Sequence, residues 1–554
     1  MLHNPDDAPG ITPNSVADLL GETVARFGPH PAMAFLGRGW TYDQLGVLVD
    51  RAARGLQDIG VIPGARVGLC LPNTPYYIIF YYAVLRIGGI VVNFNPLYVE
   101  RELIQQIGDS GATIMVTLDL EVIYRRVANV ADASGLQRIV VCPMTGILPR
   151  GKALLFRLLK RSQVARIPVD ERHVAFAAIT ANPAPPTRVA INPADDVAVL
   201  QYTGGTTGLP KGAMLTHANL TANSRQVRRH WAGARLGEER VLAALPFFHV
   251  FAMTAVLNYS VEIGAEIIMV PRFELKQVLA TIRKRRVTIF HAVPTIYTAI
   301  NAASGRVDLS SLRFSVSGGA PLPGEVRTRF VELTGCKLVE GYGLTEASPV
   351  VSSNPPDGVN KGGSVGLPML DTVIEIRDPT EPTRLLPVLE RGEVCVRGPQ
   401  VMAGYWNRPA DTAAVFVDGA LRTGDIGYLD TDGYLFLVDR IKDVILCGGY
   451  NVYPRVLEDA LYQHPAVLEA TVIGVPDAYR GQTPKAFVVL RPGHAATGDE
   501  LRTFLTGYVS KIELPKSVEI RASLPKTLIG KLSKKELVAE EAAHAGPAAS
   551  EPAG

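Results

Sequence analysis

Cysteine is scarce in this chain of 554 residues, and an excess of charge of either sign is absent. The five cysteines (Cys70, Cys142, Cys336, Cys395 and Cys447) are scattered and form no Cys-x-x-Cys pair, which argues against a disulfide framework and a structural zinc site. They indicate a reducing compartment, so we expect a cytoplasmic protein. A formal net charge of +3 gives no support for nucleic acid as a partner.

Signals for export and for membrane spans are also lacking. Residues 1–15 are acidic and contain proline, whereas a signal peptide needs a basic start and an apolar run. The uncharged stretch 67–85 is long enough to suggest a span, but Pro72, Asn73 and Pro75 interrupt it. We expect a strand, a turn and a buried helix in this stretch.

Several catalytic signatures are missing or incomplete. No His-Glu-x-x-His spacing occurs, so protein-bound zinc is not expected. Residues 362–366 fit the Gly-x-Ser-x-Gly pattern of hydrolases, but loop-forming residues surround them where that motif needs a strand and a helix. The glycine-rich segments also lack the βαβ context of a dinucleotide fold. These three enzyme classes are therefore disfavoured.

The length of the chain exceeds what one hydrophobic core usually organises, so at least two domains are expected. Short β-branched runs first alternate with helical patterns, which is typical of parallel sheets covered by helices. The pattern becomes turn-rich near Glu393 and compact α+β after Asp439. We predict an α/β fold with a large N-terminal domain of parallel sheets flanked by helices (1–439), including a small antiparallel β subdomain near 365–439, then a small α+β C-terminal domain (440–540) and a disordered tail (541–554).

A glycine- and threonine-rich string follows the apolar run 197–202 and reads TGGTTGLPKG from Thr203 to Gly212. Glycines and hydroxyl side chains at this density let backbone N–H groups wrap a phosphate chain, and Lys211 adds a positive charge. It is not a Walker A loop, because no Gly-Lys-Ser/Thr occurs. Taken alone, such a string can also be an ordinary turn.

The whole string resembles the phosphate loop of the adenylate-forming superfamily, which comprises acyl-CoA synthetases, peptide-synthetase adenylation domains and luciferases. Further motifs similar to those of that superfamily follow in order: SGGAPLP from Ser317, EGYGLTE from Glu340, RTGD from Arg422, DRIKD from Asp439, GGYNVYP from Gly448 and LPKTLIGK ending at Lys531. Singly, a Thr-Glu pair is most often a helix N-cap, and a lone charge is a solvated side chain. The joint order over residues 200–535 favours the superfamily.

The resemblance implies a role for each motif. Thr345 would contact the α-phosphate, Glu346 would hold Mg²⁺ together with Thr203, Lys531 would be the adenylation lysine, and Lys442 the pivot between domains. Asp425 would accept hydrogen bonds from both ribose hydroxyls, a task that suits two carboxylate oxygens. The residues expected to bind ATP and AMP are Thr203, Gly204, Gly205, Thr206, Thr207, Gly208, Lys211, Gly318, Gly319, Ala320, Pro321, Gly341, Tyr342, Gly343, Asp425 and Arg440; those expected to bind coenzyme A are Gly448, Gly449, Tyr450 and Asn451.

The activity that the resemblance implies is that of an AMP-forming acid–thiol ligase. A carboxylate and ATP would give acyl-AMP and pyrophosphate, and acyl-AMP and coenzyme A would then give acyl-CoA and AMP. Carboxylate and phosphate are both anionic, so the first step needs fixed positive charge at the α-phosphate. The resemblance also implies that the C-terminal domain (440–540) is hinged and mobile: between the steps it would turn, withdrawing Lys531 and presenting residues 448–453.

Apolar residues dominate the segment expected to contact the acid. His249, Val250, Phe251 and Met253 resemble the family segment at the acyl entrance, although such residues can equally be plain core. No acidic residue in this segment would pair with a substrate ammonium, which disfavours amino acids. The resemblance to bacterial long-chain fatty acid–CoA ligases covers nearly the whole chain and predicts a long-chain fatty acid. The alternatives are a medium-chain, aromatic or terpenoid acid, or an acyl-AMP ligase that loads a carrier protein.

An insert at 148–192 contains a basic and leucine-rich stretch, 150–161. On a helix, Leu154, Leu155, Leu158 and Leu159 would share one face, and basic residues would occupy much of the remainder. Such a helix can lie on an anionic membrane surface, where fatty acids partition, or pack on its own domain. Peripheral contact with lipid at the inner face of the plasma membrane is therefore one prediction. The sequence is also compatible with an oligomer.

Overall fold

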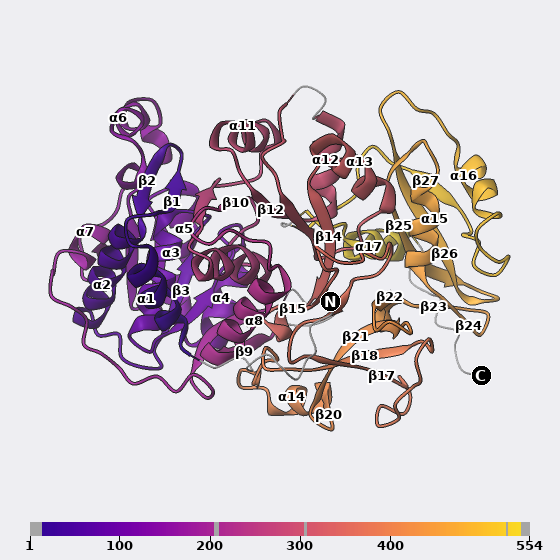
Figure 1. Cartoon of the computed structure of the whole chain (residues 1–554), viewed down its shortest axis with the longest axis horizontal. Coiled ribbons are helices and arrows are strands. Elements are labelled where there is room, and N and C mark those ends of the chain that lie inside the picture. Colours follow the sequence, from indigo (N-terminus) through magenta and orange to yellow (C-terminus); the bar gives the residue numbers. More distant parts are fainter. Residues whose placement is uncertain (1–13, 204–209, 304–306, 528–529, 545–554) are drawn as a thin grey trace, which may run out of the picture.

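The computed structural model describes residues 14–203, 210–303, 307–527 and 530–544. Two large mixed sheets and their covering helices form the N-terminal domain (Figure 1). The eight-stranded sheet has the order β19-β9-β8-β4-β3-β5-β6-β7, parallel from β8 to β7. Its strands are β3 (Arg66–Cys70), β4 (Ile90–Asn93), β5 (Ile114–Leu118), β6 (Arg138–Cys142), β7 (His173–Ala175), β8 (Val197–Tyr202), β9 (Gly212–Thr216) and β19 (Gly404–Tyr405).

The nine-stranded sheet has the order β16-β15-β14-β13-β12-β10-β11-β1-β2 and is parallel from β14 to β1. Both sheets end in antiparallel strands, which the expectation of parallel sheets omitted. At one edge the two-residue turn Leu36–Gly37, with both φ positive, forces a hairpin between β1 and β2. The strands are β1 (Pro31–Phe35), β2 (Arg38–Thr41), β10 (Arg240–Ala243), β11 (Glu266–Met269), β12 (Ile289–Ala292), β13 (Phe314–Ser317), β14 (Lys337–Gly343), β15 (Val350–Ser353) and β16 (Leu367–Pro368).

Helix α3 (Pro75–Arg86) lies at the centre of the core. It begins after Thr74 with a proline in its first turn, where a missing N–H costs nothing. Every residue from Pro75 to Leu85 is buried, so the expected strand, turn and buried helix are confirmed. In the described part of the chain, no helix has the length and apolarity that crossing a bilayer requires.

The other helices of this domain cover the sheets or connect their strands. They are α1 (Val16–Phe27), α2 (Tyr42–Asp58), α4 (Glu100–Ser110), α5 (Glu121–Ser134), α6 (Arg150–Leu159), α7 (Phe176–Ile179), α8 (His217–His230), α9 (Val250–Ala252), α10 (Tyr259–Glu262), α11 (Leu275–Arg285), α12 (Pro294–Ala303), α13 (Gly324–Thr334) and α14 (Pro409–Val415).

A five-stranded antiparallel sheet forms the β subdomain. It consists of β17 (Val373–Arg377), β18 (Gly392–Arg397), β20 (Phe416–Val417), β21 (Ala420–Leu429) and β22 (Leu435–Arg440). Residues 362–366 lie before it without a helix after them, and Ser364 Oγ donates to the carbonyl of Leu435, so they do not form a nucleophile elbow.

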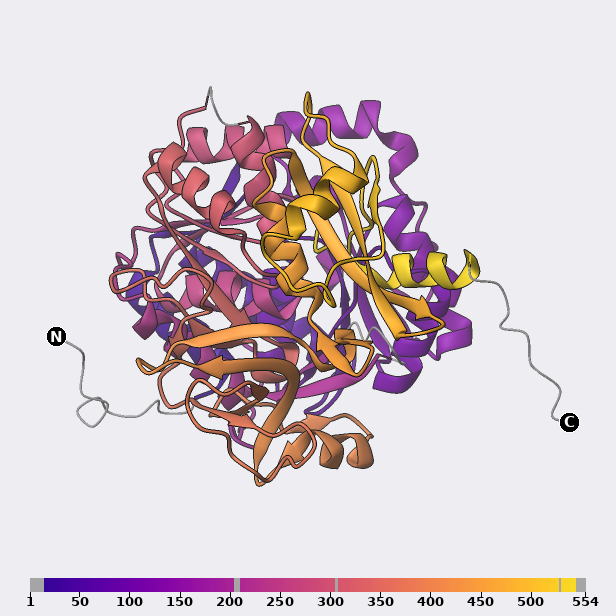
Figure 2. The same ribbon diagram turned by 90° about the vertical axis from the view of Figure 1, so that its right-hand side faces the viewer.

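The C-terminal domain is a sheet with three helices and has its own buried cores (Figures 1 and 2). Its strands are β23 (Ile445–Cys447), β24 (Tyr450–Val452), β25 (Val467–Asp477), β26 (Gly481–Leu490) and β27 (Val518–Ile520), and its helices are α15 (Pro454–Tyr462), α16 (Gly498–Leu505) and α17 (Lys534–His544). The predicted fold class is confirmed. The predicted tail at 541–554 was placed too early, because α17 continues to His544 and Glu541 accepts a hydrogen bond from Lys485 Nζ (2.7 Å). Residues 545–554 lie outside the described part.

Candidate active site

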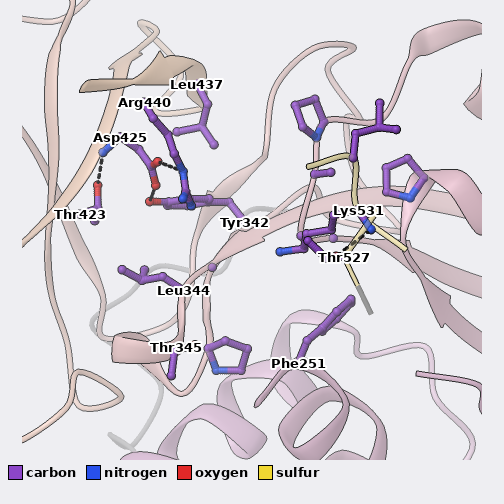
Figure 3. Close-up of a pocket in the computed structure, with 18 of the residues that line it drawn as sticks. Phe251, Tyr342, Leu344, Thr345, Thr423, Asp425, Leu437, Arg440, Thr527 and Lys531 are labelled. Carbon is purple, nitrogen blue, oxygen red and sulfur yellow. Dashed lines mark hydrogen bonds and ion pairs between the residues drawn. The ribbon is translucent and has the colours of Figure 1, made fainter. Parts of the chain in front are cut away.

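A cavity of about 1360 Å³ lies where the N-terminal domain, the β subdomain and the C-terminal domain meet (Figure 3). Its wall includes the ends of β8, β13 and β14, the middle of β21, the end of β22 and the segment around Lys531. One small ligand usually occupies roughly 300–1,000 Å³. This cavity therefore has room for more than one substrate.

The carboxyl ends of the parallel strands β13 and β14 form one wall, as is usual for ligand sites in open α/β sheets. Residues 318–321 follow β13, residues 341–343 end β14, and all of them line the cavity. Gly319 has φ +83°, and a Cβ there would lie 2.5 Å from Lys531 Cε. A Cβ on Gly318 would lie 3.1 Å from the ring of Phe251. Glycine here allows two side chains to approach the backbone closely.

Asp425 is held by two neighbours at the junction of the β subdomain and β14. It is paired in register with Arg440 across β21 and β22, and Arg440 Nε lies 3.1 Å from Asp425 Oδ1. The Tyr342 hydroxyl donates to Asp425 Oδ2 (2.5 Å). The negative charge of Asp425 raises the pKa of Arg440, and burial, then Asp425, raises the pKa of Tyr342. A carboxylate oxygen has two lone pairs, so both oxygens can still accept from a ligand.

Lys531 reaches the same cavity from the C-terminal domain. Its loop is tied by a hydrogen bond from Thr527 N to Lys531 O (2.7 Å) and one from Lys531 N to Thr527 Oγ1 (3.1 Å). Thr295 Oγ1, at the start of α12, donates to the carbonyl of Gly530 (2.7 Å) and so fixes the loop to the N-terminal domain. Burial, together with the positive charge of Arg440, lowers the pKa of Lys531 to about 8. A desolvated ammonium of this kind is a strong partner for an anion.

Thr345 and Glu346 lie in a short 3₁₀ helix (Thr345–Ala347) just after β14, and both line the cavity. The Tyr405 hydroxyl donates to Glu346 Oε1 (2.7 Å). Burial, then the charge of Glu346, raises the pKa of Tyr405, so this phenol stays a donor. The contact fixes a carboxylate in the cavity wall, to which Thr203 also contributes.

No cluster of three or more potential protein ligands for a metal occurs among the residues that the structure describes. Mg²⁺ bound together with a nucleotide usually takes only one or two carboxylates and completes its shell with phosphate oxygens and water. The oriented carboxylate of Glu346 and the hydroxyl of Thr203 fit that donor set.

The apolar side of the cavity is formed by His249, Val250 and Phe251, at the start of α9. Burial, reinforced by the charge of Lys531, lowers the pKa of His249 to about 3, so the ring is neutral. Because Nδ1 accepts from the backbone N–H of Phe251 (3.3 Å), we assign the ring proton to Nε2. The helix then widens into a π-helical segment (Met253–Asn258).

Two predicted contact residues lie elsewhere. Met253 is fully buried and is not part of the cavity wall, since its sulfur faces the core and Asn93 Nδ2 donates to it (3.4 Å). Lys211 is not in the wall either, because its Nζ lies 2.7 Å from Asp411 Oδ1 and 5.2 Å from the ring centre of Tyr405. The predicted phosphate-binding residues Gly204, Gly205, Thr206, Thr207 and Gly208 lie outside the described residues.

The residues predicted for the hinge and for coenzyme A lie on the C-terminal side. Lys442 lies in the short 3₁₀ helix Ile441–Asp443 and lines the cavity, and burial and Arg440 lower its pKa. Gly448, Gly449, Tyr450 and Asn451 form the exposed tip of the β23–β24 hairpin, outside the cavity wall.

Three side chains of the site were not predicted from the sequence. Tyr405 and Thr295 act on residues 59 and 235 positions away, so no local pattern could indicate them. Glu340 lines the cavity within a motif that was recognised, and Leu322 N donates to its Oε1 (3.1 Å). Burial raises the pKa of Glu340 to about 7. A glutamate inside an apolar strand was the available signal.

Glycine-rich strand ends, a fixed carboxylate and a lysine from a second domain line one cavity, which is the arrangement expected of the adenylate-forming class. The family model of the AMP-binding enzyme matches residues 20–406, and that of the AMP-binding enzyme C-terminal domain matches residues 456–531. The chain belongs to the AMP-binding enzyme family, and the predicted resemblance is confirmed.

The chain is similar to several characterised proteins over most of its length. It is 42% identical to the long-chain-fatty-acid–CoA ligase of Bacillus subtilis over 98% of both chains. It is 37% identical to the feruloyl-CoA synthase of Amycolatopsis sp, over 93% of this chain and 96% of the relative. The anthranilate CoA ligase AuaEII in complex with anthranoyl-AMP superposes with a TM-score of 0.81 at 26% identity, covering 98% of this chain and 100% of that one.

Proposed function

We propose that this protein is an AMP-forming long-chain fatty acid–CoA ligase, which uses ATP to activate the acid and then transfers the acyl group to coenzyme A. The observation that carries this proposal is the position of Lys531. Its side chain enters one cavity that also contains the Asp425–Arg440 pair and the apolar wall at Phe251. In this proposal, the lysine cation would serve between a nucleotide at the Asp425 side and an acid at the Phe251 side.

In the adenylation step, the adenine would lie against residues 318–321 and 341–343, and the ribose hydroxyls would donate to Asp425. Lys531 and Thr345 would then contact the α-phosphate. Attack of the acid's carboxylate on phosphorus forms the acyl–phosphate bond and expels pyrophosphate. Lys531 offsets the negative charge that accumulates, and its buried position strengthens that interaction. Neutral His249 is a hydrogen-bond donor that can orient the carboxylate without forming an ion pair with it.

Glu346 and Thr203 would hold Mg²⁺ on the nucleotide side of the cavity. The ion supplies charge neutralisation of the phosphates when it is bound. Tyr405 keeps the glutamate oriented toward that position. In this conformation Lys211 is paired with Asp411, and we infer that it exchanges this partner for a phosphate when ATP binds.

The thioester step requires a different arrangement of the small domain. The 448–451 hairpin is exposed, whereas Lys531 occupies the cavity. We infer that the C-terminal domain turns about Lys442, which lies between β22 and β23, and brings the hairpin to the mouth of the cavity. Coenzyme A provides its own nucleophilic thiol, so the protein needs no covalent intermediate.

The proposed acid is long-chain and aliphatic. The wall at Val250 and Phe251 is apolar, and the Bacillus subtilis relative carries the name of a ligase for such acids. The feruloyl-CoA synthase at 37% identity keeps an aromatic acid as the second candidate. Because long-chain acids partition into membranes, we also propose that the protein meets its substrate at a lipid surface.

The test is a substrate panel with the purified protein, Mg-ATP and coenzyme A. Acetate, octanoate, palmitate and ferulate would be compared by the release of AMP and pyrophosphate and by the formation of acyl-CoA. A kcat/KM that peaks at palmitate supports the proposal. A peak at ferulate would overturn the proposed long-chain acid substrate. Pyrophosphate release with no thioester would indicate an enzyme that loads a carrier protein.

A further inference from the structure

Helix α6 leaves its leucines in water. Figure 1 shows the helix at the upper left edge of the molecule, on the opposite side from the C-terminal domain. Leu154, Leu155, Leu158 and Leu159 are 61%, 54%, 69% and 70% exposed, and no residue of the helix is buried. Single exposed leucines are common, but four adjacent ones on one short helix mark an interaction surface.

The helix is attached to the domain by its other side. Ala153 and Phe156 pack against the core, and Lys152 Nζ donates to the carbonyl of Leu36 (2.7 Å). At about 100° per residue, the arc of the four leucines lies opposite the direction shared by Ala153 and Phe156. The sequence left open whether the leucine face packs on its own domain, and the structure turns that face outward.

The charge around this face has one sign. Between residues 143 and 169 the chain contains no acidic residue, and its six basic residues are Arg150, Lys152, Arg157, Lys160, Arg161 and Arg166. On the helix, Arg150 and Arg157 flank the Leu154 side of the apolar arc, and Lys152 flanks the Leu159 side. An apolar face bordered by cations is the pattern of helices that lie in the plane of a membrane interface.

We propose that α6 is the docking surface of this protein for an anionic lipid bilayer. The leucines enter the boundary between head groups and acyl chains, and the flanking arginines bind head-group phosphates. Charge favours lipid over a second copy of the chain, because stacking two leucine faces would bring together two basic clusters without a neighbouring acidic residue. The inference does not depend on which acid the enzyme activates.

The experiment is sedimentation of the full-length protein with vesicles of phosphatidylcholine mixed with phosphatidylglycerol, without ATP, coenzyme A or acid. The variant Leu154→Asp with Leu158→Asp should lower the partition coefficient roughly ten-fold or more, because it removes apolar surface and adds negative charge. The matched control is Val47→Asp with Val122→Asp, two exposed helical positions elsewhere (51% and 63%), and it should bind like the parent protein. Replacing Arg157 and Arg161 by glutamine should weaken binding roughly five-fold per residue on these vesicles but little on pure phosphatidylcholine.

Three results would overturn the proposal. The first is failure of the parent protein to bind vesicles, and the second is a control variant that loses as much vesicle binding as the leucine variant. The third is a dimer, seen in light scattering, that the leucine substitutions abolish and that added vesicles do not dissociate. Thermal melting of each variant shows that it is folded. Octanoyl-CoA formation in the absence of vesicles should be unchanged by the leucine substitutions. Ligase activity without vesicle binding would refute the docking surface alone, whereas vesicle binding without ligase activity would refute the proposed function alone.

Discussion

The decline of the adenylation rate at alkaline pH should depend on a single amine. Burial and the nearby Arg440 lower the pKa of Lys531 to about 8, so deprotonation removes a positive charge from the cavity within the accessible pH range. About nine-tenths of the amine is charged at pH 7 and about one-tenth at pH 9, so kcat/KM for ATP should fall roughly ten-fold between them and ten-fold per unit beyond. Bound phosphates favour the charged form, which moves the same decline in kcat to higher pH.

The assay should follow the first step alone, because the thiol of coenzyme A also titrates in this range. ATP–pyrophosphate exchange with palmitate, without coenzyme A, meets that condition. His249 does not interfere, since its pKa is about 3. Lys442, whose pKa is also lowered, is distinguished by Lys531→Arg, which keeps a positive charge at all these pH values. The exchange rate of the arginine variant, whatever its absolute value, should no longer fall at alkaline pH. If the rate of this variant still falls, the assignment to Lys531 is refuted.

Three substitutions probe the same geometry. Lys531→Ala should lower adenylation by roughly 10²–10³ and leave thioester formation from supplied acyl-AMP within about two-fold, and equal loss in both half-reactions would contradict the domain rotation. Gly319→Ala should cost about 1 kcal/mol of stability, because φ is positive there, and should slow adenylation by displacing the Lys531 side chain. The control Gly324→Ala, which has open space around it, should change neither the melting temperature nor the exchange rate. Tyr405→Phe removes the hydrogen bond to Glu346. It should weaken the apparent affinity for Mg²⁺ by about 1 kcal/mol, which raises the Mg²⁺ concentration at half-maximal exchange roughly five-fold. An unaltered Mg²⁺ titration would show that this contact does not orient Glu346.

The sequence predicted those parts of the site that depend on a few consecutive residues. The strings around Gly319, Thr345 and Asp425 were identified because they resemble motifs of the adenylate-forming superfamily, and residues of all three line the cavity. Contacts between distant segments were not accessible in this way. Neither the hydrogen bond from Thr295 to Gly530 nor the pairing of Lys211 with Asp411 leaves a pattern in either segment.

The same distinction applies to the direction in which a side chain points. The leucine pattern of α6 predicted an amphipathic helix, but its outward face follows from where Phe156 and Lys152 attach it to the domain. Met253 illustrates the opposite case. The sequence placed it with His249 and Phe251 on an acyl wall, yet the change to a π-helical segment after Ala252 accompanies its burial in the core. The apolar pattern of the segment therefore did not distinguish Phe251, which lines the cavity, from Met253, which does not.

The buried apolar cores of the N-terminal and C-terminal domains are separate, which suits the proposed movement of Lys531 into and out of the cavity. The buried apolar clusters of the C-terminal domain draw all their members from residues 445–537, and those of the N-terminal domain end before residue 440. The contacts that hold the domains in this arrangement include the hydrogen bond from Thr295 to Gly530 and the exposed Arg491–Glu325 ion pair (3.0 Å).

Such contacts contribute little to the free energy of closure. A hydrogen bond adds about 1 kcal/mol, and an exposed ion pair adds about 0–1 kcal/mol. An energy of this size shifts a two-state equilibrium by only about one order of magnitude. Under the proposed domain rotation, the negative charge of ATP beside Lys531 would favour the closed arrangement, and loss of pyrophosphate from the cavity would lower that charge and release the domain. In that proposal, the position of the C-terminal domain follows the progress of the first reaction through the charge near Lys531, and the separate buried cores stay intact.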